Sequence, residues 1–191
     1  MKKVGLLGGT FDPPHIGHLL MAEEARVQLK LDEVWWMPNK IPPHKKKDSS
    51  TNDKERITMV ELMTKTNDSF TVCDVEFKRE GPSYTVDTIE HLKGEFPKNE
   101  FFFIIGGDSL ETLPTWHESE RLQSLIPFVV IERPGFPIQK NDHPGNIHLL
   151  EAPAIDVSST YIREKFNTDQ FNRFLMTNEV YEFIKEHKLY E

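Results

Sequence analysis

Short apolar runs alternate along the chain with stretches whose apolar residues recur at helical spacing. Six runs have the length and composition of buried strands, and they cover residues 3–7, 33–37, 70–77, 100–105, 128–132 and 147–151. Strands that alternate with helices are typical of an open, mostly parallel sheet with helices on both faces. The pattern therefore predicts the α/β fold class.

Two stretches predict helices, and two others predict loops. Ile16, Leu20 and Val27 stand at offsets of four and eleven residues, which places them on one face of a helix that can cover the sheet. Residues 177–188 predict a C-terminal helix, and its packed side contains Val180, Phe183, Ile184 and His187. Prolines, a basic run and small polar residues predict a long exposed loop over residues 38–50, and residues 133–145 are also irregular.

The chain length of 191 residues fits a single domain over residues 1–191, and no internal repeat or linker divides it. Lys and Arg number 23 against 31 Asp and Glu, which gives a net charge of -8. This overall field disfavours nonspecific binding to a nucleic acid polymer. An anionic ligand would therefore need a locally basic pocket.

The chain has a single cysteine, Cys73, which cannot close an intramolecular disulfide or build a multi-thiolate zinc site. The N-terminal residues lack the apolar stretch of a secretion signal, and no apolar run approaches membrane-spanning length. We therefore expect a cytoplasmic protein without a membrane partner. The sequence leaves the oligomeric state open, a homo-oligomer included.

The densest group of candidate functional residues follows the first predicted strand, where the sequence reads GGTFDPPHIGH from Gly8 to His18. Two adjacent glycines let backbone N–H groups approach a phosphate, and a helix that begins near His15 would add its positive dipole end. The spacing differs from the dinucleotide-binding fingerprint, and no lysine follows as in the Gly-Lys-Ser/Thr phosphate loop.

His15 and His18 stand three residues apart, so at a helix N-terminus both can point toward one site. Imidazole N–H groups can donate hydrogen bonds to phosphate oxygens, which suits phosphoryl chemistry. An isolated His-x-x-His is also compatible with a metal-binding pair or with two partly buried structural histidines. The glycine turn and the Asp-Pro-Pro sequence favour the phosphate site.

With these residues the chain resembles the nucleotidyltransferases whose motif is Gly-x-Phe-Asp-x-x-His-x-Gly-His, and among them the bacterial nicotinate mononucleotide adenylyltransferases. Further matches extend the resemblance from Gly8 to Arg163. The resemblance implies a Rossmann-like, doubly wound sheet and transfer of the adenylyl group of ATP to nicotinate mononucleotide, which gives deamido-NAD and pyrophosphate. Mg²⁺ bound with ATP is expected from the chemistry of ATP and from the resemblance, because the sequence shows no carboxylate cage for a metal.

The resemblance also assigns roles to individual residues. The expected catalytic residues are His15, His18, Lys45 and Arg163. The expected ATP-binding residues are Gly8, Gly9, Thr10, Phe11, His15, His18, Gly106, Asp108, Ser158, Ser159 and Arg163. The expected residues for nicotinate mononucleotide are His44, Lys45, Ser83, Tyr84, Thr85 and Trp116.

Several of these residues also have a purely structural interpretation. His44 and Lys45 lie in a charge run that can simply be solvated, and Ser83 can be the N-cap of a helix whose apolar positions are Val86, Ile89 and Leu92. The resemblance instead makes residues 83–85 a carboxylate site that binds largely through backbone N–H groups.

Two residues further along the chain are similarly ambiguous. Asp108 can cap a turn or bind ribose hydroxyls, and Trp116 can be a core residue or stack on the pyridine ring. Ser158 and Ser159 begin a predicted helix, and Arg163 lies about one turn further on, so their donors can converge on a triphosphate. The same residues are also compatible with an N-capped helix that carries an exposed arginine. The neighbouring pair Trp35 and Trp36 lies in a predicted strand and is interpreted as packing.

Two other functions stay open at this point. Another adenylyltransferase or a cytidylyltransferase would share the histidine motif but would have no pyridine for Trp116 to contact. A regulator that binds ATP without turnover would use the same histidines as sensors. Release of pyrophosphate separates an enzyme from such a regulator.

Overall fold

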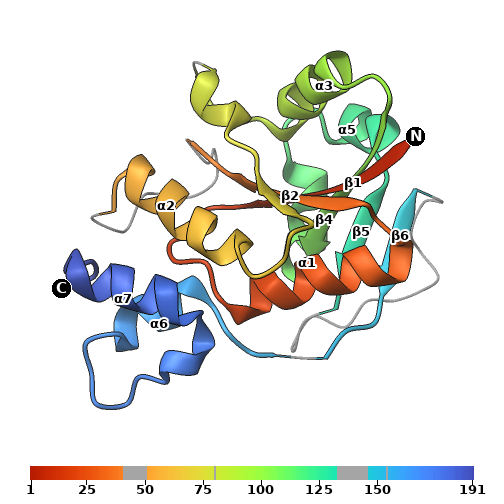
Figure 1. The fold of residues 1–191 in the computed structure, drawn as a ribbon. Coiled ribbons are helices and arrows are strands. Elements are labelled where there is room, and N and C mark those ends of the chain that lie inside the picture. The colour runs from red at the N-terminus through yellow and green to blue at the C-terminus, as the bar shows by residue number, and fades with distance from the viewer. Residues whose placement is uncertain (41–50, 80, 133–145, 154) are drawn as a thin grey trace.

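The fold is built on one parallel sheet, as the apolar runs predict. The computed structural model describes residues 1–40, 51–79, 81–132, 146–153 and 155–191. Within them, six strands pair in the order β3-β2-β1-β4-β5-β6, and every pair is parallel (Figure 1). The strands are β1 Lys2–Gly9, β2 Glu33–Pro38, β3 Phe70–Val72, β4 Asn99–Gly106, β5 Phe128–Ile131 and β6 Ile147–Leu150.

The strand order reverses at the centre of the sheet. The chain moves outward from β1 through β2 to β3, and then returns to the other side of β1 and moves outward from β4 to β6. In open α/β sheets such a reversal leaves a crevice at the carboxyl ends of the two central strands, and ligands bind there. Here these ends carry Gly8 and Gly9 on β1 and Gly106 on β4, so the doubly wound prediction is confirmed and places the glycine turn at the crevice.

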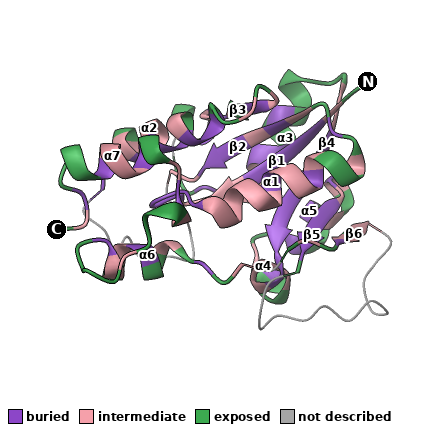
Figure 2. Ribbon diagram, turned by 60° about the horizontal axis from the view of Figure 1, so that its bottom comes forward, coloured by how far each residue is buried: buried purple, intermediate pink, exposed green. Residues whose placement is uncertain are grey.

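Helices cover both faces of the sheet (Figure 1). The helices are α1 Ile16–Leu29, α2 Asp53–Thr64, α3 Thr85–Glu95, α4 Gly107–Thr112, α5 Ser119–Leu125, α6 Ser159–Lys165 and α7 Asn178–Glu186. Side chains of α1, α2, α6 and α7 share one buried cluster with Phe102 and Ile104 of β4, whereas α3 and α5 pack with Phe101, Phe103 and Ile105. Alternate residues of one strand therefore face opposite layers, and Figure 2 shows the strands buried between them.

Three details of the sequence prediction are wrong. The strand expected over residues 70–77 ends at Val72, because Asp74 leaves the extended region (φ -91°, ψ 17°) and a 3₁₀ turn, Val75–Lys78, follows. Val27 is 55% exposed, and α1 instead buries Ala22 and Ala25, whose small side chains let the helix lie close to the sheet. His187 lies just beyond α7 and is exposed, and its ring stacks on Phe183 at 4.1 Å.

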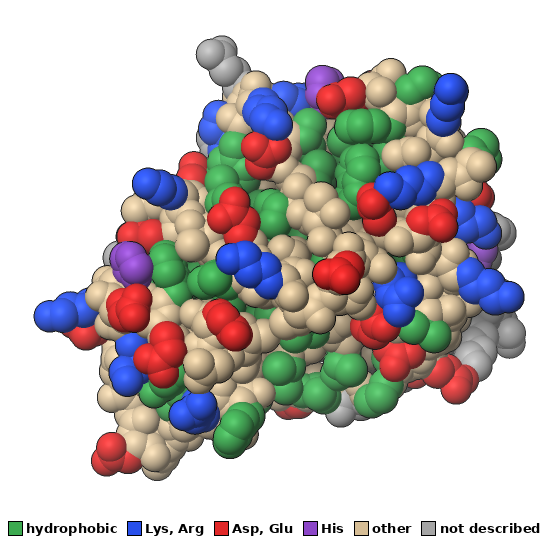
Figure 3. All heavy atoms as spheres, in the orientation of Figure 1, with side chains coloured by type: hydrophobic (Ala, Val, Ile, Leu, Met, Phe, Trp, Pro, Cys, Tyr) green, Lys and Arg blue, Asp and Glu red, His purple; other side chains and the backbone are tan. Residues whose placement is uncertain are grey.

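Other sequence predictions are confirmed. Val86, Ile89 and Leu92 form the buried face of α3, and Val180 and Ile184 that of α7. Trp36 is fully buried, and the Trp35 ring packs edge-on against Phe96 and Phe101. Across the described ranges, none of the helices is long and apolar enough to span a membrane. Acidic and basic side chains are interspersed on the face shown in Figure 3.

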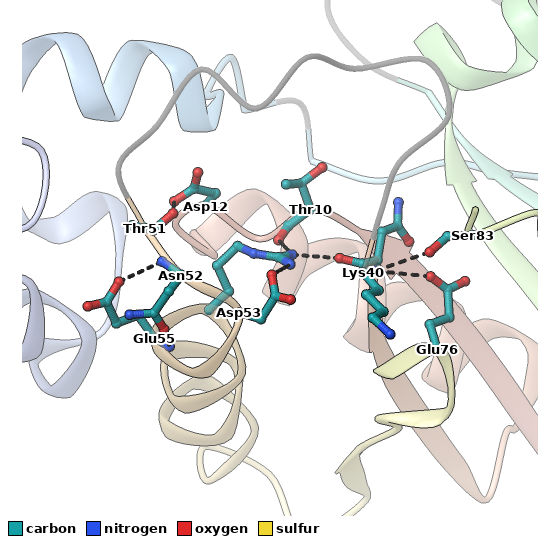
Figure 4. A network of polar contacts seen from close by, with 11 residues as sticks. Thr10, Asp12, Lys40, Thr51, Asn52, Asp53, Glu55, Glu76 and Ser83 are labelled. Carbon is teal, nitrogen blue, oxygen red and sulfur yellow. Dashed lines mark hydrogen bonds and ion pairs between the residues drawn. The ribbon is translucent and has the colours of Figure 1, made fainter. Parts of the chain in front are cut away.

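A buried arginine on α2 ties the ends of β1 and β2 together. The helix begins with a reciprocal cap in which Asn52 Oδ1 accepts from the Glu55 N–H at 2.9 Å and the Asn52 N–H donates to Glu55 Oε2 at 2.7 Å (Figure 4). One turn later Arg56, with a side chain only 3% exposed, donates from Nη1 to the carbonyls of Thr10 at 3.0 Å and Asn39 at 2.7 Å. Its Nη2 donates to Asp53 at 2.7 Å. The turn after β1 therefore depends on a hydrogen-bond donor from α2.

Replacing this arginine tests that dependence. Arg56→Met leaves two partly buried carbonyls without the donor that Arg56 supplies, so we expect the free energy of unfolding to fall by about 2–4 kcal/mol. The measurement is urea unfolding at neutral pH. The control is Arg26→Met, because Arg26 pairs with a partly exposed Glu23 on the surface of α1 and its loss is expected to cost under about 1 kcal/mol. Equal losses in the two variants would contradict this role of Arg56.

Candidate active site

The turn after β1 is shaped by an aromatic side chain as much as by its glycines. Phe11 has a left-handed backbone (φ 51°), and its ring is buried against Trp36 at 5.4 Å and edge-on to His18 at 4.9 Å. A Cβ on Gly9 would lie 3.0 Å from the Phe11 ring, and one on Gly8 would lie 3.1 Å from Phe103. The glycines therefore make room for these rings. Because the Phe11 ring is buried, any contact of Phe11 with a nucleotide would come from its backbone.

The two histidines of the motif lie together at the start of α1. His15 is the N-cap residue, and its backbone N–H donates to Nδ1 of His18 at 3.2 Å. The ring centroids are 3.8 Å apart; His15 is buried and His18 is half-buried. Because Nδ1 of His18 accepts a hydrogen bond, the proton of its neutral ring is on Nε2. His18 can therefore donate from Nε2.

Gly17, between the two histidines, is required by packing. A Cβ at this position would lie 3.0 Å from Cγ1 of Val157 and 3.1 Å from the His15 ring. Such contacts are tighter than ordinary van der Waals distances, so a side chain here would displace the ring or the segment before α6. Sequence reasoning gave no reason for this glycine.

Helix α6 docks on the same turn, as the predicted convergence requires. Ser158 is its N-cap and accepts from the Tyr161 N–H at 3.1 Å, so its hydroxyl has a structural use. The Ser159 hydroxyl donates to the Pro13 carbonyl at 2.9 Å, and Arg163 Nη1 donates to the Asp12 carbonyl at 2.8 Å. These contacts join residues about 150 positions apart and place the guanidinium of Arg163 at the histidine motif.

The second strand at the crevice brings its own glycine and a carboxylate. β1 and β4 pair in parallel up to Leu7 with Ile104, so Gly9 and Gly106 each stand two residues beyond this pair, at the same edge of the sheet. Asp108 follows in the first turn of α4 and is half-buried. Asp108 is thus at the crevice, where the resemblance expects a ribose.

Around the start of α3 the structure corrects one interpretation and adds a contact. The N-cap of α3 is Tyr84, so Ser83 is not the cap. The Ser83 hydroxyl accepts from the Lys40 N–H at 3.2 Å instead. The Tyr84 ring stacks on His117 at 4.1 Å, and the adjacent Trp116 packs edge-on against Phe103. This stack, which sequence reasoning missed, joins the α3 start to the loop that carries Trp116.

Beneath the α3 start lies a buried carboxylate that sequence reasoning also missed. Glu76 is 4% exposed and accepts from the Lys40 N–H at 3.3 Å, a contact shown in Figure 4. It also accepts from the Thr88 hydroxyl at 3.2 Å. Burial raises the pKa of Glu76, while its hydrogen bonds with Ser83 and Lys40 and the nearby Arg79 act in the opposite direction. A glutamate inside the apolar run of residues 70–77 was the available signal.

Comparisons with known proteins identify the family of this chain. Residues 6–165 match the cytidylyltransferase-like family model. The chain is 46% identical over 191 residues to nicotinate-nucleotide adenylyltransferase of Bacillus subtilis (strain 168), with all of both chains covered. The chain belongs to the nicotinate-nucleotide adenylyltransferase family.

Another relative and a solved structure extend the comparison. A probable nicotinate-nucleotide adenylyltransferase of Bacillus pumilus (strain SAFR-032) is 47% identical, again over the full length of both chains. The fold is similar to that of the Plasmodium falciparum nicotinic acid mononucleotide adenylyltransferase complexed with NaAD. The TM-score is 0.84 at 21% identity, and the match covers 100% of this chain and 98% of that one.

The expected site residues of the nicotinate-nucleotide adenylyltransferase family fall into two groups in the structure. Residues 8–18 lie with Ser158, Ser159 and Arg163 on one side of the crevice, and residues 83–85 lie with Trp116 and its loop on the other. His44 and Lys45 lie outside the described residues. Within the described ranges, no three His, Cys, Asp or Glu side chains are grouped to hold a metal ion.

The pH dependence of stability tests the burial of Glu76. Because burial raises the pKa of Glu76 in the folded protein, its contribution to stability is fully present below the unfolded pKa and is lost as pH rises through the folded pKa. Gln does not ionise, so as pH rises from below the unfolded pKa of Glu through the raised folded pKa, the free energy of unfolding of Glu76→Gln should increase relative to that of the parent protein. Urea unfolding across this range checks the sign. Exposed Glu111→Gln is the control, and a difference independent of pH for Glu76→Gln would contradict the burial argument.

Proposed function

We propose that this protein transfers the adenylyl group of ATP to nicotinate mononucleotide, with deamido-NAD and pyrophosphate as products. The observation that carries the proposal is the docking of α6 on the histidine turn at the crevice between β1 and β4. It brings two imidazoles, a guanidinium and a helix N-terminus to one place, which is a set of donors for a polyphosphate. The full-length relatives at 46–47% identity support the same reaction.

ATP is proposed to bind with its phosphates between the histidine turn and α6. His18 donates from Nε2, and Arg163 extends from α6 toward the same turn. Mg²⁺ is proposed to arrive with ATP as part of the substrate. That ion commonly keeps several waters and uses substrate phosphates as ligands, so it needs few protein carboxylates.

The proposed reaction is an in-line displacement at the α-phosphorus. A phosphate oxygen of the mononucleotide attacks the α-phosphorus. The bond between the α-phosphorus and the oxygen that bridges to the β-phosphate breaks, and pyrophosphate leaves with that electron pair. The attacking group is already an anion, so the protein supplies no general base. Its contribution is alignment and stabilisation of the charge that grows on the phosphate oxygens, through His15, His18 and Arg163.

The acceptor is proposed to bind at the start of α3. Backbone N–H groups and the positive end of the helix dipole at residues 83–85 favour a carboxylate, and Trp116 supplies an aromatic face for the pyridine ring. The Ser83 hydroxyl already accepts from Lys40, so the backbone is the better source of donors there.

Pyrophosphate release tests the proposal directly. The purified protein is incubated with ATP or CTP and with nicotinate mononucleotide, nicotinamide mononucleotide or phosphopantetheine, and products are resolved by chromatography. Deamido-NAD from ATP and nicotinate mononucleotide is the expected main product. ATP binding without pyrophosphate release would reject the enzyme, and faster turnover of CTP or of phosphopantetheine would reject this substrate pair.

Removal of His18 tests the proposed charge stabilisation. His18→Ala is expected to lower kcat about 10²-fold or more, with little change in affinity for nicotinate mononucleotide, because its partner is charge that develops in the transition state. Steady-state kinetics and calorimetric titration of the acceptor measure the two effects. His91→Ala is the control, since His91 is exposed on α3 and pairs with Glu95 at 3.4 Å. A His18→Ala variant with the parent kcat would reject the role.

Acceptor choice tests the helix start of α3. The amide of nicotinamide mononucleotide would place an NH₂ against N–H donors, and an unsatisfied buried donor costs about 1–3 kcal/mol. We therefore expect kcat/KM to favour the acid by at least about tenfold. Trp116→Ala should lower kcat/KM for both acceptors by similar factors, because stacking contacts the ring and not its substituent. Equal kcat/KM for the two acceptors would contradict the assignment of residues 83–85.

A further inference from the structure

The carboxylate of Asp12 joins segments that are far apart in the sequence. Asp12 is 5% exposed within the histidine turn. Its Oδ1 accepts from the Tyr190 hydroxyl at 2.7 Å and from the Thr51 hydroxyl at 2.8 Å, and Figure 4 shows the contact with Thr51. These donors are 178 and 39 residues away from Asp12 in the sequence. Two hydroxyl donors therefore hold one oxygen of a buried acid.

The backbone of the same residue holds a group of the proposed ATP site. Arg163 Nη1 donates to the Asp12 carbonyl at 2.8 Å, and Ser159 donates to the next carbonyl, that of Pro13. A displacement of Asp12 would therefore move the acceptor of Arg163 and the chain that leads to His15. Asp12 couples the end of the chain to the phosphate-binding side of the crevice.

Tyr190 itself is held firmly in place. Lys188 and Tyr190 both have left-handed backbones (φ 51° and 68°), an uncommon conformation for residues other than glycine. Leu189 between them is buried, and its N–H donates to the Ile184 carbonyl at 3.0 Å. Asn167 donates to the Tyr190 carbonyl at 2.8 Å. Burial, and then the charge of Asp12, raise the pKa of the Tyr190 hydroxyl far above its usual range, so the hydroxyl keeps its proton and donates it.

We infer that the Tyr190 hydroxyl is a positioning group for the transfer reaction: through Asp12 it fixes the turn that presents His15 and Arg163 to the triphosphate. This inference rests on the proposed function. Tyr190 acts through another residue and contacts no substrate in this scheme. Asp12 serves as a hydrogen-bond acceptor, and its carboxylate needs no direct contact with ATP.

Removal of one oxygen atom tests the inference. Tyr190→Phe keeps the ring and removes the donor, and the lost bond is to a charged acceptor, so we expect ATP affinity and kcat/KM for ATP to fall by about tenfold. Tyr181→Phe is the matched control, because the Tyr181 ring also packs against Phe166 in the same aromatic group and lies on α7. This control should keep the parent kinetics. All assays are done well below the lowest melting temperature of the set.

Substitutions of Asp12 separate positioning from simple anchoring. Asp12→Asn keeps an acceptor oxygen and should recover most of the ATP affinity that Asp12→Ala loses. In the Asp12→Ala background, Tyr190→Phe should add no further loss, because the group through which it acts is gone. Kinetics of Tyr190→Phe equal to the parent's with only a lower melting temperature, or full additivity with Asp12→Ala, would overturn the inference.

Calorimetric titration with ATP alone keeps this test independent of the acceptor. If the parent protein binds ATP but fails to adenylylate nicotinate mononucleotide, the proposed function fails, and the ATP affinities of the Tyr190→Phe and Asp12→Asn variants still decide the inference. Unchanged ATP affinity in Tyr190→Phe beside an active parent would overturn the inference alone. A parent protein that binds no ATP would overturn both.

Discussion

The carbonyl groups of the turn after β1 have to be satisfied away from any regular ladder, and much of the molecule is arranged to do so. Arg56 of α2 donates to Thr10, Arg163 of α6 donates to Asp12, and Ser159 donates to Pro13. Buried backbone acceptors without partners are costly, so an irregular turn at the centre of a sheet needs donors from outside. The two helices that supply these donors are thereby placed around the turn.

The same requirement holds short elements at the histidine turn. α6 has only seven residues and would be marginal alone, yet its N-cap and two side-chain contacts hold it against the histidine turn. The His18 ring is held by the hydrogen bond that Nδ1 accepts from the His15 backbone N–H, and the lack of a side chain at Gly17 leaves room for the His15 ring. The proposed reaction needs no general base, so in that scheme it depends mainly on such placement of donors.

The sequence predicted the parts of the fold that depend on local pattern, and it missed those that depend on distant partners. Five of the six strands lie close to their predicted positions, because continuous apolar runs between turn signals identify buried parallel strands. Val27 was wrongly predicted on the buried face of α1, because a pattern of large apolar residues overlooks Ala22 and Ala25, whose small side chains allow close packing.

The residues of the candidate site likewise divide into those that a local motif identifies and those that only distant contacts identify. The glycine turn, the histidines and the α6 serines stand in contiguous motifs, whereas Arg56 and Tyr190 are isolated residues whose partners are 46 and 178 positions away. Nothing local to either residue indicates its role. Glu76 is intermediate: the run of residues 70–77 holds two acids, Asp74 and Glu76, and the run alone indicates neither which of them is buried nor what it contacts.

The two groups of site residues belong to opposite layers of the protein. Ile162 of α6 is buried in the cluster on one face of the sheet, and Val86 of α3 is buried in the cluster on the other. In the proposed scheme the nucleotide and its acceptor therefore approach the central crevice from different sides, and neither has to pass through the position of the other. In that scheme deamido-NAD, which contains both the adenylyl group and the acceptor, spans the two layers across the crevice, whereas pyrophosphate contacts only the histidine side.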